Sequence, residues 1–177
     1  FQNFQFLYKY PKDNRFSIDK LLAVSKLFEY SSLLLSNDLK VNKYSSYQTV
    51  LALGAKNVLK SNRESFQSLR DFHKLHNDWM FGFLSYDLKN EIEDLQSNNI
   101  DKFNIPNLFF YVPETIVFIL DNDVVIESIH SKSKIDVLVN SLNNLDLDDE
   151  KVDSIDLNPR ESKDEYLKKI IQDLENC

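Results

Sequence analysis

Apolar residues recur every three or four positions in four segments, which is the spacing of an amphipathic helix. These predicted helices span residues 18–28, 62–76, 132–144 and 162–177, and Ser17 stands before the first as an N-cap. The pairs Ser61 with Glu64 and Ser162 with Glu165 have the spacing of capping boxes, in which each side chain satisfies a free backbone N–H. The side chains expected on the apolar faces are Ile18, Leu21, Leu22, Val24 and Leu27 in the first helix, Phe66, Leu69, Phe72 and Leu75 in the second, and Tyr166, Leu167, Ile170, Ile171 and Leu174 in the last.

Shorter apolar segments, bounded by Asn, Asp, Gly or Pro, predict strands. They cover residues 29–36, 49–53, 79–86, 108–112, 115–120 and 123–129. Gly54 ends the second, and Asp121-Asn122 joins the last two as a hairpin turn. The strands from residue 79 onward follow one another closely, so they predict an antiparallel meander.

Helices and strands that come in runs, without strict alternation, predict an α+β fold. We expect antiparallel sheets in a meander or sandwich-like arrangement, with helices on their flanks. A doubly wound parallel sheet is disfavoured because its phosphate-binding turn needs several glycines, and the chain has only Gly54 and Gly82.

Composition and charge argue against several classes of protein. Lys and Arg number 21 against 28 Asp and Glu, a formal charge of −7, and no window combines clustered basic residues with aromatics, so no nucleic-acid partner is expected. No apolar run approaches the roughly 18 residues of a membrane span, and the first residues lack the pattern of a signal peptide.

The single cysteine, Cys177, fits a reducing compartment, and we expect a cytoplasmic protein. The sequence lacks an initiator methionine and stops inside a helical pattern, so we expect it to be a piece of a longer chain.

Histidine and serine side chains that could carry chemistry have simpler interpretations. His73 and His76 could share a metal, but no third ligand accompanies them, and the last turn of a helix favours a cation, so we expect them to face solvent. His130 stands alone and is expected at a strand end. Ser85 lacks the second glycine of a nucleophile elbow.

The carboxylates are interpreted in the same way. Asp87 and Glu93 could form an acid and base pair, but the preferred interpretation is that Asp87 ends a strand and caps a short helix over residues 88–95. The acidic residues between 146 and 156 lack the glycine and the ligand spacing of a calcium loop, so they predict a solvated linker. The sequence therefore predicts no catalytic residue and no metal ligand in this chain.

Four short motifs occur in a particular order. Residues 33–36, LLLS, are followed by Tyr44-Ser45, and residues 82–87, GFLSYD, are followed by Glu93. Residues 105–107, IPN, stand ahead of a strand pair, and a helical segment from residue 162 ends the chain. Together they resemble the N-terminal region of component I chorismate-utilising enzymes, which comprise the aminodeoxychorismate (para-aminobenzoate) synthases and the anthranilate synthases.

The resemblance implies a parent enzyme that aminates chorismate, with chorismate and Mg²⁺ bound in a C-terminal region that this sequence does not reach. Residues 1–157 would then form an N-terminal α+β domain, and residues 158–177 a helix leading into that region. The chain alone is expected to be inactive. By the resemblance, it supplies a sheet scaffold, contacts a glutamine amidotransferase subunit or domain, and contributes to a pocket for L-tryptophan.

The same resemblance implies roles for individual residues. Ser36, Tyr44 and Ser45 match positions around the tryptophan pocket. The structural motif corresponds to Gly82, Tyr86, Asp87 and Glu93.

Leu35 departs from the anthranilate synthase pattern L-L-E-S, in which a glutamate stands at this position. An apolar side chain cannot form a charge-assisted hydrogen bond with a ligand ammonium group. The departure favours the aminodeoxychorismate branch, which serves folate biosynthesis, over anthranilate synthase, which serves tryptophan biosynthesis. A ligand-sensing or subunit-docking module, with residues 36–47 as its binding surface, and an unrelated α+β domain are the alternatives.

Overall fold

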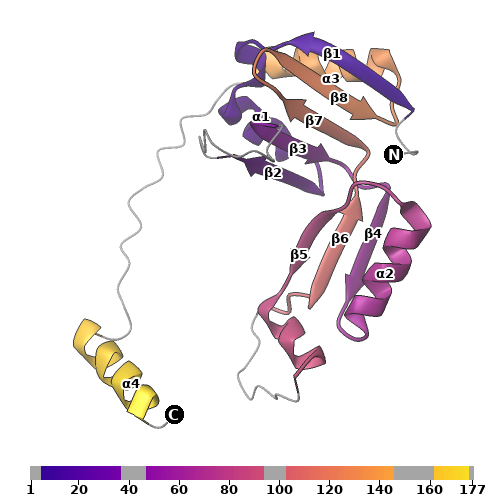
Figure 1. Ribbon diagram of the computed structural model, residues 1–177. Coiled ribbons are helices and arrows are strands. Elements are labelled where there is room, and N and C mark those ends of the chain that lie inside the picture. Colours follow the sequence, from indigo (N-terminus) through magenta and orange to yellow (C-terminus); the bar gives the residue numbers. More distant parts are fainter. Residues whose placement is uncertain (1–4, 37–46, 94–102, 146–161, 176–177) are drawn as a thin grey trace. The chain divides into compact units, whose positions relative to one another are not determined.

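The computed structural model describes residues 5–36, 47–93, 103–145 and 162–175, with side chains in the last range up to residue 172. The chain divides into two compact units, Phe1–Leu147 and Asp148–Cys177 (Figure 1). The strands, all in the first unit, are β1 (Phe6–Pro11), β2 (Ser31–Leu35), β3 (Thr49–Leu53), β4 (Asn57–Ser61), β5 (Phe81–Leu84), β6 (Leu108–Val112), β7 (Thr115–Ile119) and β8 (Asp123–Ser128). Its helices are α1 (Ile18–Ser25), α2 (Ser65–His76) and α3 (Lys132–Asn144), with short 3₁₀ helices η1 (Asn14–Phe16) and η2 (Tyr86–Glu91). The second unit contains α4 (Lys163–Glu175).

Two antiparallel sheets organise the described part of the first unit. Five strands form a first sheet in the order β1-β8-β7-β3-β2, and three form a second sheet in the order β4-β6-β5. Every neighbouring pair of strands is antiparallel. This is the α+β class with antiparallel sheets and flanking helices that the sequence predicts.

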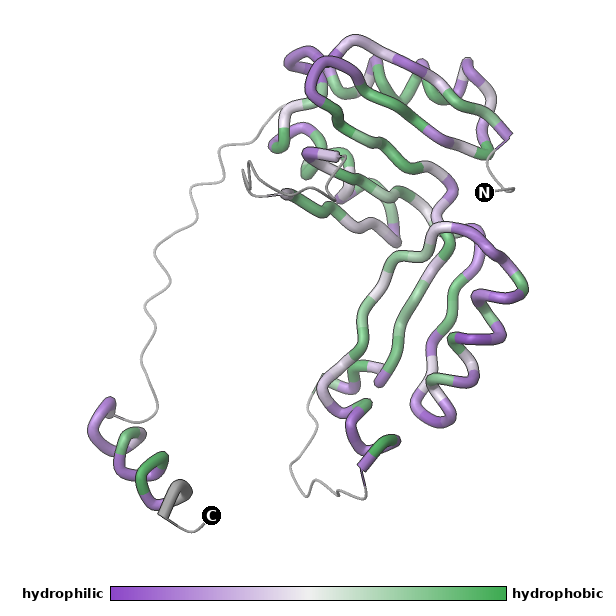
Figure 2. Tube along the Cα trace, in the orientation of Figure 1, coloured by the Kyte–Doolittle hydropathy of each residue, from purple (hydrophilic) through white to green (hydrophobic). Residues whose placement is uncertain are grey.

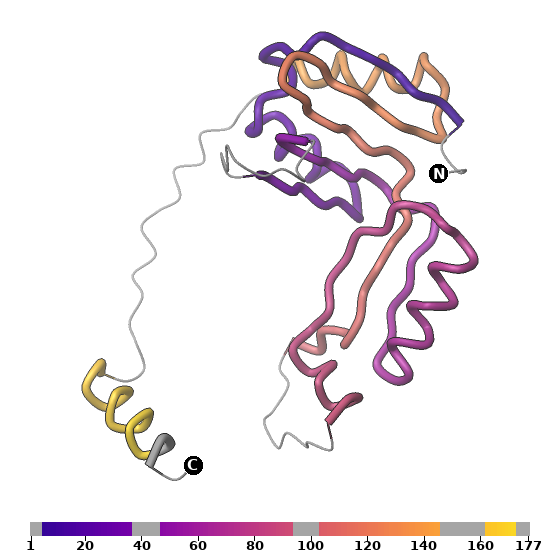
Figure 3. The backbone as a smooth tube through the Cα atoms, viewed as in Figure 1, coloured from indigo at the N-terminus to yellow at the C-terminus, as the bar shows by residue number. Residues whose placement is uncertain are grey.

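The two sheets share one antiparallel ribbon that bends at a corner, which Figure 3 lets the reader trace. β3 leads into β4, and β6 leads into β7. At the corner, residues 54–56 lie opposite residues 113 and 114, and backbone hydrogen bonds from Glu114 to Leu53 (3.2 Å) and from Lys56 to Val112 (2.9 Å) span it. The extra residue acts as a β-bulge, which lets a strand pass from one sheet to another. Gly54 supplies the left-handed backbone, with a φ of 69°.

The first hydrophobic core lies between one face of the first sheet and the helices α1 and α3. Leu51, Val117 and Ile126 alternate with residues of the opposite face, as strand periodicity requires, and they pack with helix residues such as Leu21 and Val139. Figure 2 shows these strands as largely apolar and the helices as apolar on one side. Each helix is therefore held against the first sheet by the burial of one stripe of apolar side chains.

The second core joins the two sheets and is rich in aromatic rings. Ala52, Ile116 and Phe118 come from the opposite face of the first sheet, and Phe81 and Tyr111 come from the second sheet. We define the aromatic cluster by its ring contacts as Tyr30, Tyr47, Trp79, Phe81, Phe83, Phe109, Tyr111 and Phe118. Aromatic contacts of this kind add about 0.5–1.5 kcal/mol per pair beyond area burial.

The strand predictions are confirmed for most segments and wrong in two respects. Strands occupy five of the six predicted segments over nearly the predicted residues, while the segment 79–86 contains the shorter β5. The β7–β8 hairpin turns through Asp121-Asn122, as expected. The predicted meander is wrong, because β6 and β7 lie in different sheets and are separated by the corner. β1 and β4 were not predicted: β1 is a largely exposed edge strand, and in β4 only two apolar residues stand between polar ones.

The helix predictions need a correction at α2. This helix begins at Ser65, and Ser61 belongs to β4 with its hydroxyl donated to the Arg63 carbonyl, so the capping box at Ser61 and Glu64 is wrong. Leu75 is 77% exposed, because α2 packs against β4 and β6 along the stripe of Ser65, Leu69 and Phe72 instead.

In α1 the buried face is narrower than predicted. Leu21 and Val24 are buried, while Ile18 and Leu22 are about half exposed and Leu27 lies beyond the helix end. The buried stripe is limited to the side that meets the first sheet and α3.

The capping box of α4 is confirmed. The Ser162 N–H and hydroxyl donate to Glu165 Oε2 at 2.9 and 2.8 Å, and the Glu165 N–H donates to the Ser162 hydroxyl at 3.3 Å. The side chain of Leu174 and the predicted acidic linker between residues 146 and 156 lie outside the described residues. No helix in the described ranges is long and apolar enough to cross a membrane.

Candidate functional site

Ser36, the first residue expected at a ligand pocket, lies one position beyond β2. Its backbone N–H donates to the Gln48 carbonyl at 3.0 Å, and the Gln48 N–H donates to the Ile119 carbonyl at 2.8 Å. These bonds extend the β2–β3 and β3–β7 ladders and fix the backbone at Ser36. Tyr44 and Ser45 lie outside the described residues.

A polar network surrounds this end of the first sheet. Gln48 accepts a hydrogen bond from Lys12 Nζ through its side-chain oxygen and donates to Asp121 Oδ1 at 2.8 Å through its amide nitrogen. The three side chains come from three separate segments, so they hold the β7–β8 turn and the end of β1 against the start of β3. The arrangement offers polar groups at the surface but no nucleophile with an adjacent base.

The aromatic cluster supplies the apolar side of the same region. The ring of Tyr47 lies 4.6 Å from that of Phe118, and Trp79 lies 5.7 Å from Phe118 on β7. Tyr111 is buried and donates its hydroxyl to Ser32 Oγ on β2 at 2.9 Å, which links the two sheets. Burial raises the pKa of Tyr111, and the hydrogen bond with Ser32 acts in the opposite direction.

Gly82, the glycine of the motif, stands in the middle of β5 where the backbone of β6 comes very close. A Cβ at this position would collide with the carbonyl oxygen of Phe109 and lie 2.7 Å from the Cα of Phe110. Phe81 and Phe83 project to the other face, where they contact Tyr111 and Phe109. The missing side chain of this glycine therefore permits the close approach of the β6 backbone.

Tyr86 and Asp87 follow β5 as the first residues of η2, and both are exposed. The ammonium of Lys89 lies 4.4 Å from the centre of the Tyr86 ring, so this tyrosine takes part in a surface cation–π contact. Glu93 is exposed just beyond η2. Asp87 and Glu93 are therefore both carboxylates at the protein surface.

The predicted capping role of Asp87 is wrong. The 3₁₀ helix begins one residue earlier, at Tyr86, with Ser85 at the N-cap position and no side-chain capping bond. The Ser85 N–H donates to the Asn107 carbonyl at 2.8 Å, so β5 and β6 stay paired up to this residue. Leu88, in the same turn, is buried. The end of the predicted helix, residues 94 and 95, lies outside the described residues.

Glu91 is the residue that sequence reasoning missed. Its carboxylate accepts from the backbone N–H of Ser65 at 2.7 Å and from the Ser65 hydroxyl at 2.5 Å. It therefore caps α2 from a segment 26 residues away, where an anion is also favoured by the helix dipole. No local spacing signal marks this role, because the contact depends on how β5 and η2 fold back beside α2.

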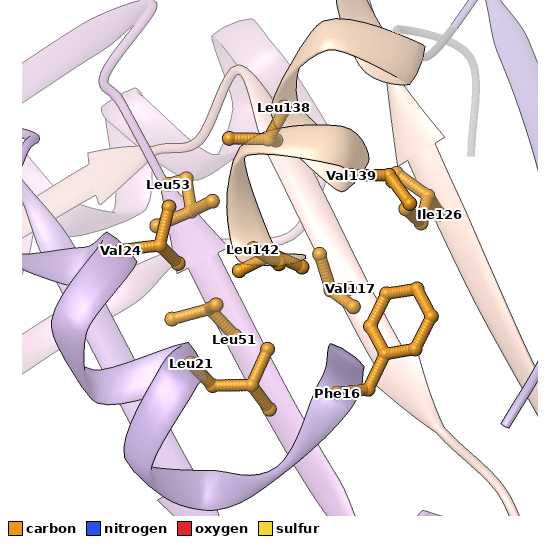
Figure 4. A pocket seen from close by; sticks show the side chains of 10 residues that line it. All are labelled: Phe16, Leu21, Val24, Leu51, Leu53, Val117, Ile126, Leu138, Val139 and Leu142. Carbon is orange, nitrogen blue, oxygen red and sulfur yellow. The ribbon is translucent and has the colours of Figure 1, made fainter. Parts of the chain in front are cut away.

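A small cavity lies in the first core, shown in Figure 4. It has a volume of about 10 Å³ and is lined by apolar side chains from α1, α3 and the first sheet, among them Leu51, Val117 and Leu142. Ligand pockets are typically about 300–1,000 Å³ and carry a few placed polar groups. This cavity is a packing void and not a binding site.

The two histidines of α2 differ in their surroundings. His73 is exposed, as expected, whereas His76 is half-buried and its ring makes an edge contact with Phe72 at 4.5 Å. His130 lies two residues beyond β8, with Nε2 3.1 Å from Glu114 Oε2. Across the described ranges, no three His, Cys, Asp or Glu side chains are grouped so that they could hold a metal ion.

Fold and site together define an α+β domain built on two antiparallel sheets, with an aromatic core at their junction. No protein-family model matches the chain, and comparison with curated proteins finds no match.

Proposed function

We propose that this chain is the N-terminal portion of an aminodeoxychorismate synthase component I. The parent enzyme would transfer ammonia to chorismate and form 4-amino-4-deoxychorismate in the cytoplasm, on the route to folate. Within it, the two-sheet domain acts as scaffold and as a contact for the glutamine amidotransferase. Catalysis and Mg²⁺ binding belong to a C-terminal region outside this sequence.

The observation that carries the proposal is the environment of Gly82. The motif GFLSYD supports the family resemblance most strongly if its glycine is structurally required. A side chain at Gly82 would collide with the backbone of β6. The neighbouring motif residues also have defined structural positions, since Tyr86 and Asp87 start η2 at the end of the same strand. The motif thus corresponds to a strand, a close backbone approach and a helical turn.

Leu35 is the observation that favours aminodeoxychorismate synthase over anthranilate synthase. It is the last residue of β2 and is 40% exposed, next to Ser36. A glutamate here could pair with a ligand ammonium group, whereas leucine offers only apolar contact. L-tryptophan binding therefore depends on Ser36 and on groups from other segments.

The reaction is tested on the full-length parent protein with chorismate, ammonia and Mg²⁺. We expect 4-amino-4-deoxychorismate as the product, identified by mass spectrometry before and after treatment with a lyase that releases para-aminobenzoate. Release of anthranilate and pyruvate would assign the protein to the anthranilate synthases instead. Residues 1–177 alone should not turn over chorismate, and turnover by this chain would contradict the proposal.

Ligand sensing is tested separately by calorimetry with L-tryptophan on the full-length protein and on Ser36→Ala. Heat that disappears in the variant would support a tryptophan pocket at this end of β2. Absence of heat in both proteins would leave the scaffold role. Contact with the amidotransferase is tested by co-purification of the two components.

A further inference from the structure

A second cavity, open to solvent, lies at the surface of the first unit and is lined by polar residues. Its volume of about 580 Å³ falls within the range of about 300–1,000 Å³ that is typical of small-molecule sites. Unlike the packing void in the first core, this cavity carries groups that can bind a ligand. The lining residues come from η1 with its N-cap, from α1 and from α3, and they are Asp13, Asn14, Arg15, Lys20 and Asn143.

Each of the three segments around the cavity is anchored in the first core by a buried residue next to a lining residue. The anchors pack in one cluster, so the backbone around the cavity is fixed before a ligand binds. A preformed site loses less conformational freedom on binding than one that must be assembled. The anchors are Phe16 beside Arg15, Leu21 beside Lys20 and Leu142 beside Asn143.

The carboxylate of Asp13 is already used by Arg15. Its Oδ1 accepts from the backbone N–H and from Nε of Arg15, both at 2.9 Å, and its Oδ2 accepts from Nε at 2.9 Å and from Nη2 at 2.7 Å. These hydrogen bonds lower the pKa of the Asp13 carboxyl. A carboxylate has about four lone-pair sites, so little capacity is left for a ligand, and the pair orients the Arg15 guanidinium.

The other groups in the cavity offer a surplus of hydrogen-bond donors. Within the described residues, Lys20 forms no ion pair, and neither its ammonium nor Nη1 of Arg15 takes part in a hydrogen bond. The side-chain amides of Asn14 and Asn143 have no hydrogen-bond partner in that part of the chain either. Arg15 balances the charge of Asp13, the one acidic residue of the lining, and Lys20 adds an uncompensated positive charge.

We propose that this cavity binds the phosphoryl group of a small phosphorylated molecule. Arginine suits phosphate through its planar fork of N–H groups, and lysine suits it as a point charge. Four side chains with unused donors exceed what the two oxygens of a carboxylate need, whereas a phosphoryl group presents three acceptor oxygens and up to two negative charges. The remaining volume accommodates the rest of the ligand. The site shares no residue with the GFLSYD motif and does not depend on the function proposed above.

The test is an NMR titration of ¹⁵N-labelled residues 1–177 with inorganic phosphate, with glycerol 3-phosphate and with acetate. The ionic strength is held at about 0.15 M, where the Debye length is about 8 Å, so that a general salt effect stays constant. The backbone amides of Arg15 and Lys20 and the side-chain amide of Asn143 should shift along one shared, saturable curve. Glycerol 3-phosphate should bind at least as tightly as inorganic phosphate, and acetate about tenfold more weakly, which corresponds to about 1.4 kcal/mol.

Two pairs of variants make the same change of charge inside and outside the cavity. Lys20→Gln should weaken the binding of glycerol 3-phosphate about tenfold, whereas Lys26→Gln, at the exposed end of α1, should leave it within about twofold. Asn143→Asp adds a carboxylate to the cavity and should also weaken binding, while Asn144→Asp adds it at a position outside the lining and should have a smaller effect. All four positions are at least partly exposed, so the variants should fold.

Three results would overturn the proposal. The first is an equal loss of affinity in Lys20→Gln and Lys26→Gln, which would reduce the effect to overall charge. The second is a set of shifts that rise without saturation. The third is binding of acetate or inorganic phosphate that is tighter than that of glycerol 3-phosphate.

Discussion

The carboxylate of Glu91 holds the first turn of α2 by accepting hydrogen bonds from both the backbone N–H and the hydroxyl of Ser65. Ser65 is fully buried, and the residue before it, Glu64, has a left-handed backbone and no capping bond of its own. The cap is therefore supplied across the second sheet, and it fastens η2 to α2. The GFLSYD motif follows α2 along the chain and runs through β5 into the first two residues of η2.

Replacing Glu91 by alanine should destabilise the first unit by about 1–3 kcal/mol, because the buried Ser65 N–H loses its acceptor and the Ser65 hydroxyl keeps only its long bond to Ser61 Oγ at 3.3 Å. Urea denaturation of residues 1–177 measures the change. Glu93→Ala is the matched control, since this exposed glutamate is close in sequence and should change the free energy of unfolding by less than about 0.5 kcal/mol. Equal effects in the two variants would contradict the capping role.

Gly82→Ala should be severely destabilising, by about 3 kcal/mol or more, because the added Cβ meets the β6 backbone, which cannot move without breaking the β5–β6 ladder. Leu84→Thr is the control on the same strand, where an exposed position accepts a β-branched residue. Thermal unfolding and the NMR spectrum report the loss of folded protein. A Gly82→Ala chain of full stability, combined with lost turnover in the parent enzyme, would mean that the glycine serves catalysis instead.

Gly54→Ala tests the corner of the ribbon. Two costs should add: the left-handed backbone, at about 1–2 kcal/mol, and crowding against the Glu114 side chain, whose Oε2 would lie 2.9 Å from the new Cβ. In a Glu114→Ala background the crowding disappears, so Gly54→Ala should cost only the backbone part. A double-mutant cycle by urea denaturation measures the difference. Identical costs in both backgrounds would show that Glu114 does not crowd this position.

Glu165 gives a prediction about pH. Its hydrogen bonds with the Ser162 backbone N–H and hydroxyl lower the pKa of the Glu165 carboxyl. A lowered folded-state pKa means that the cap stabilises α4 above the ordinary glutamate pKa and is lost as the pH falls through the folded value. An NMR titration of the Glu165 side chain should therefore have its midpoint below that of an unstructured glutamate. Ser162→Ala removes the hydroxyl bond and keeps the backbone N–H bond, so it should move the midpoint only part of the way toward the ordinary value. An unchanged midpoint would contradict the contribution of the Ser162 hydroxyl to the capping box.

The two capping boxes of identical spacing show how far the sequence could predict this structure. Ser162 and Glu165 form the box because α4 begins at Lys163, directly after Ser162. Ser61 and Glu64 do not, because residues 57–61 pair with β6 as strand β4 and the helix starts only afterwards. Both pairs carry the same hydrogen-bonding groups, so the tertiary partner of each segment decides whether a capping box forms.

The same reasoning separates the predictable parts of the candidate site from the rest. Gly82 lies in a segment that the sequence predicts as a strand, and a glycine between two strand phenylalanines has few roles. The cap by Glu91 could not be predicted, because it joins residues that are far apart in sequence and that the fold brings together. The predicted meander is wrong for a related reason. In the sequence, the corner that leads from β6 into β7 looks like an ordinary turn between two strands of one sheet.

Tyr111 and Ser32 provide the last prediction, which concerns the junction of the sheets. The Tyr111 hydroxyl reaches from β6 to Ser32 on β2 within a buried aromatic surface, and it is fully desolvated. Tyr111→Phe should cost about 1 kcal/mol, because the ring still packs and only the hydrogen bond is lost. Ser32→Ala should cost about as much or more, since it leaves the buried Tyr111 hydroxyl without a partner, and the double variant should cost less than the sum of the two. Urea denaturation of the four proteins measures this coupling. Additive costs would show that the two hydroxyls do not interact and that the sheets are held together by packing alone.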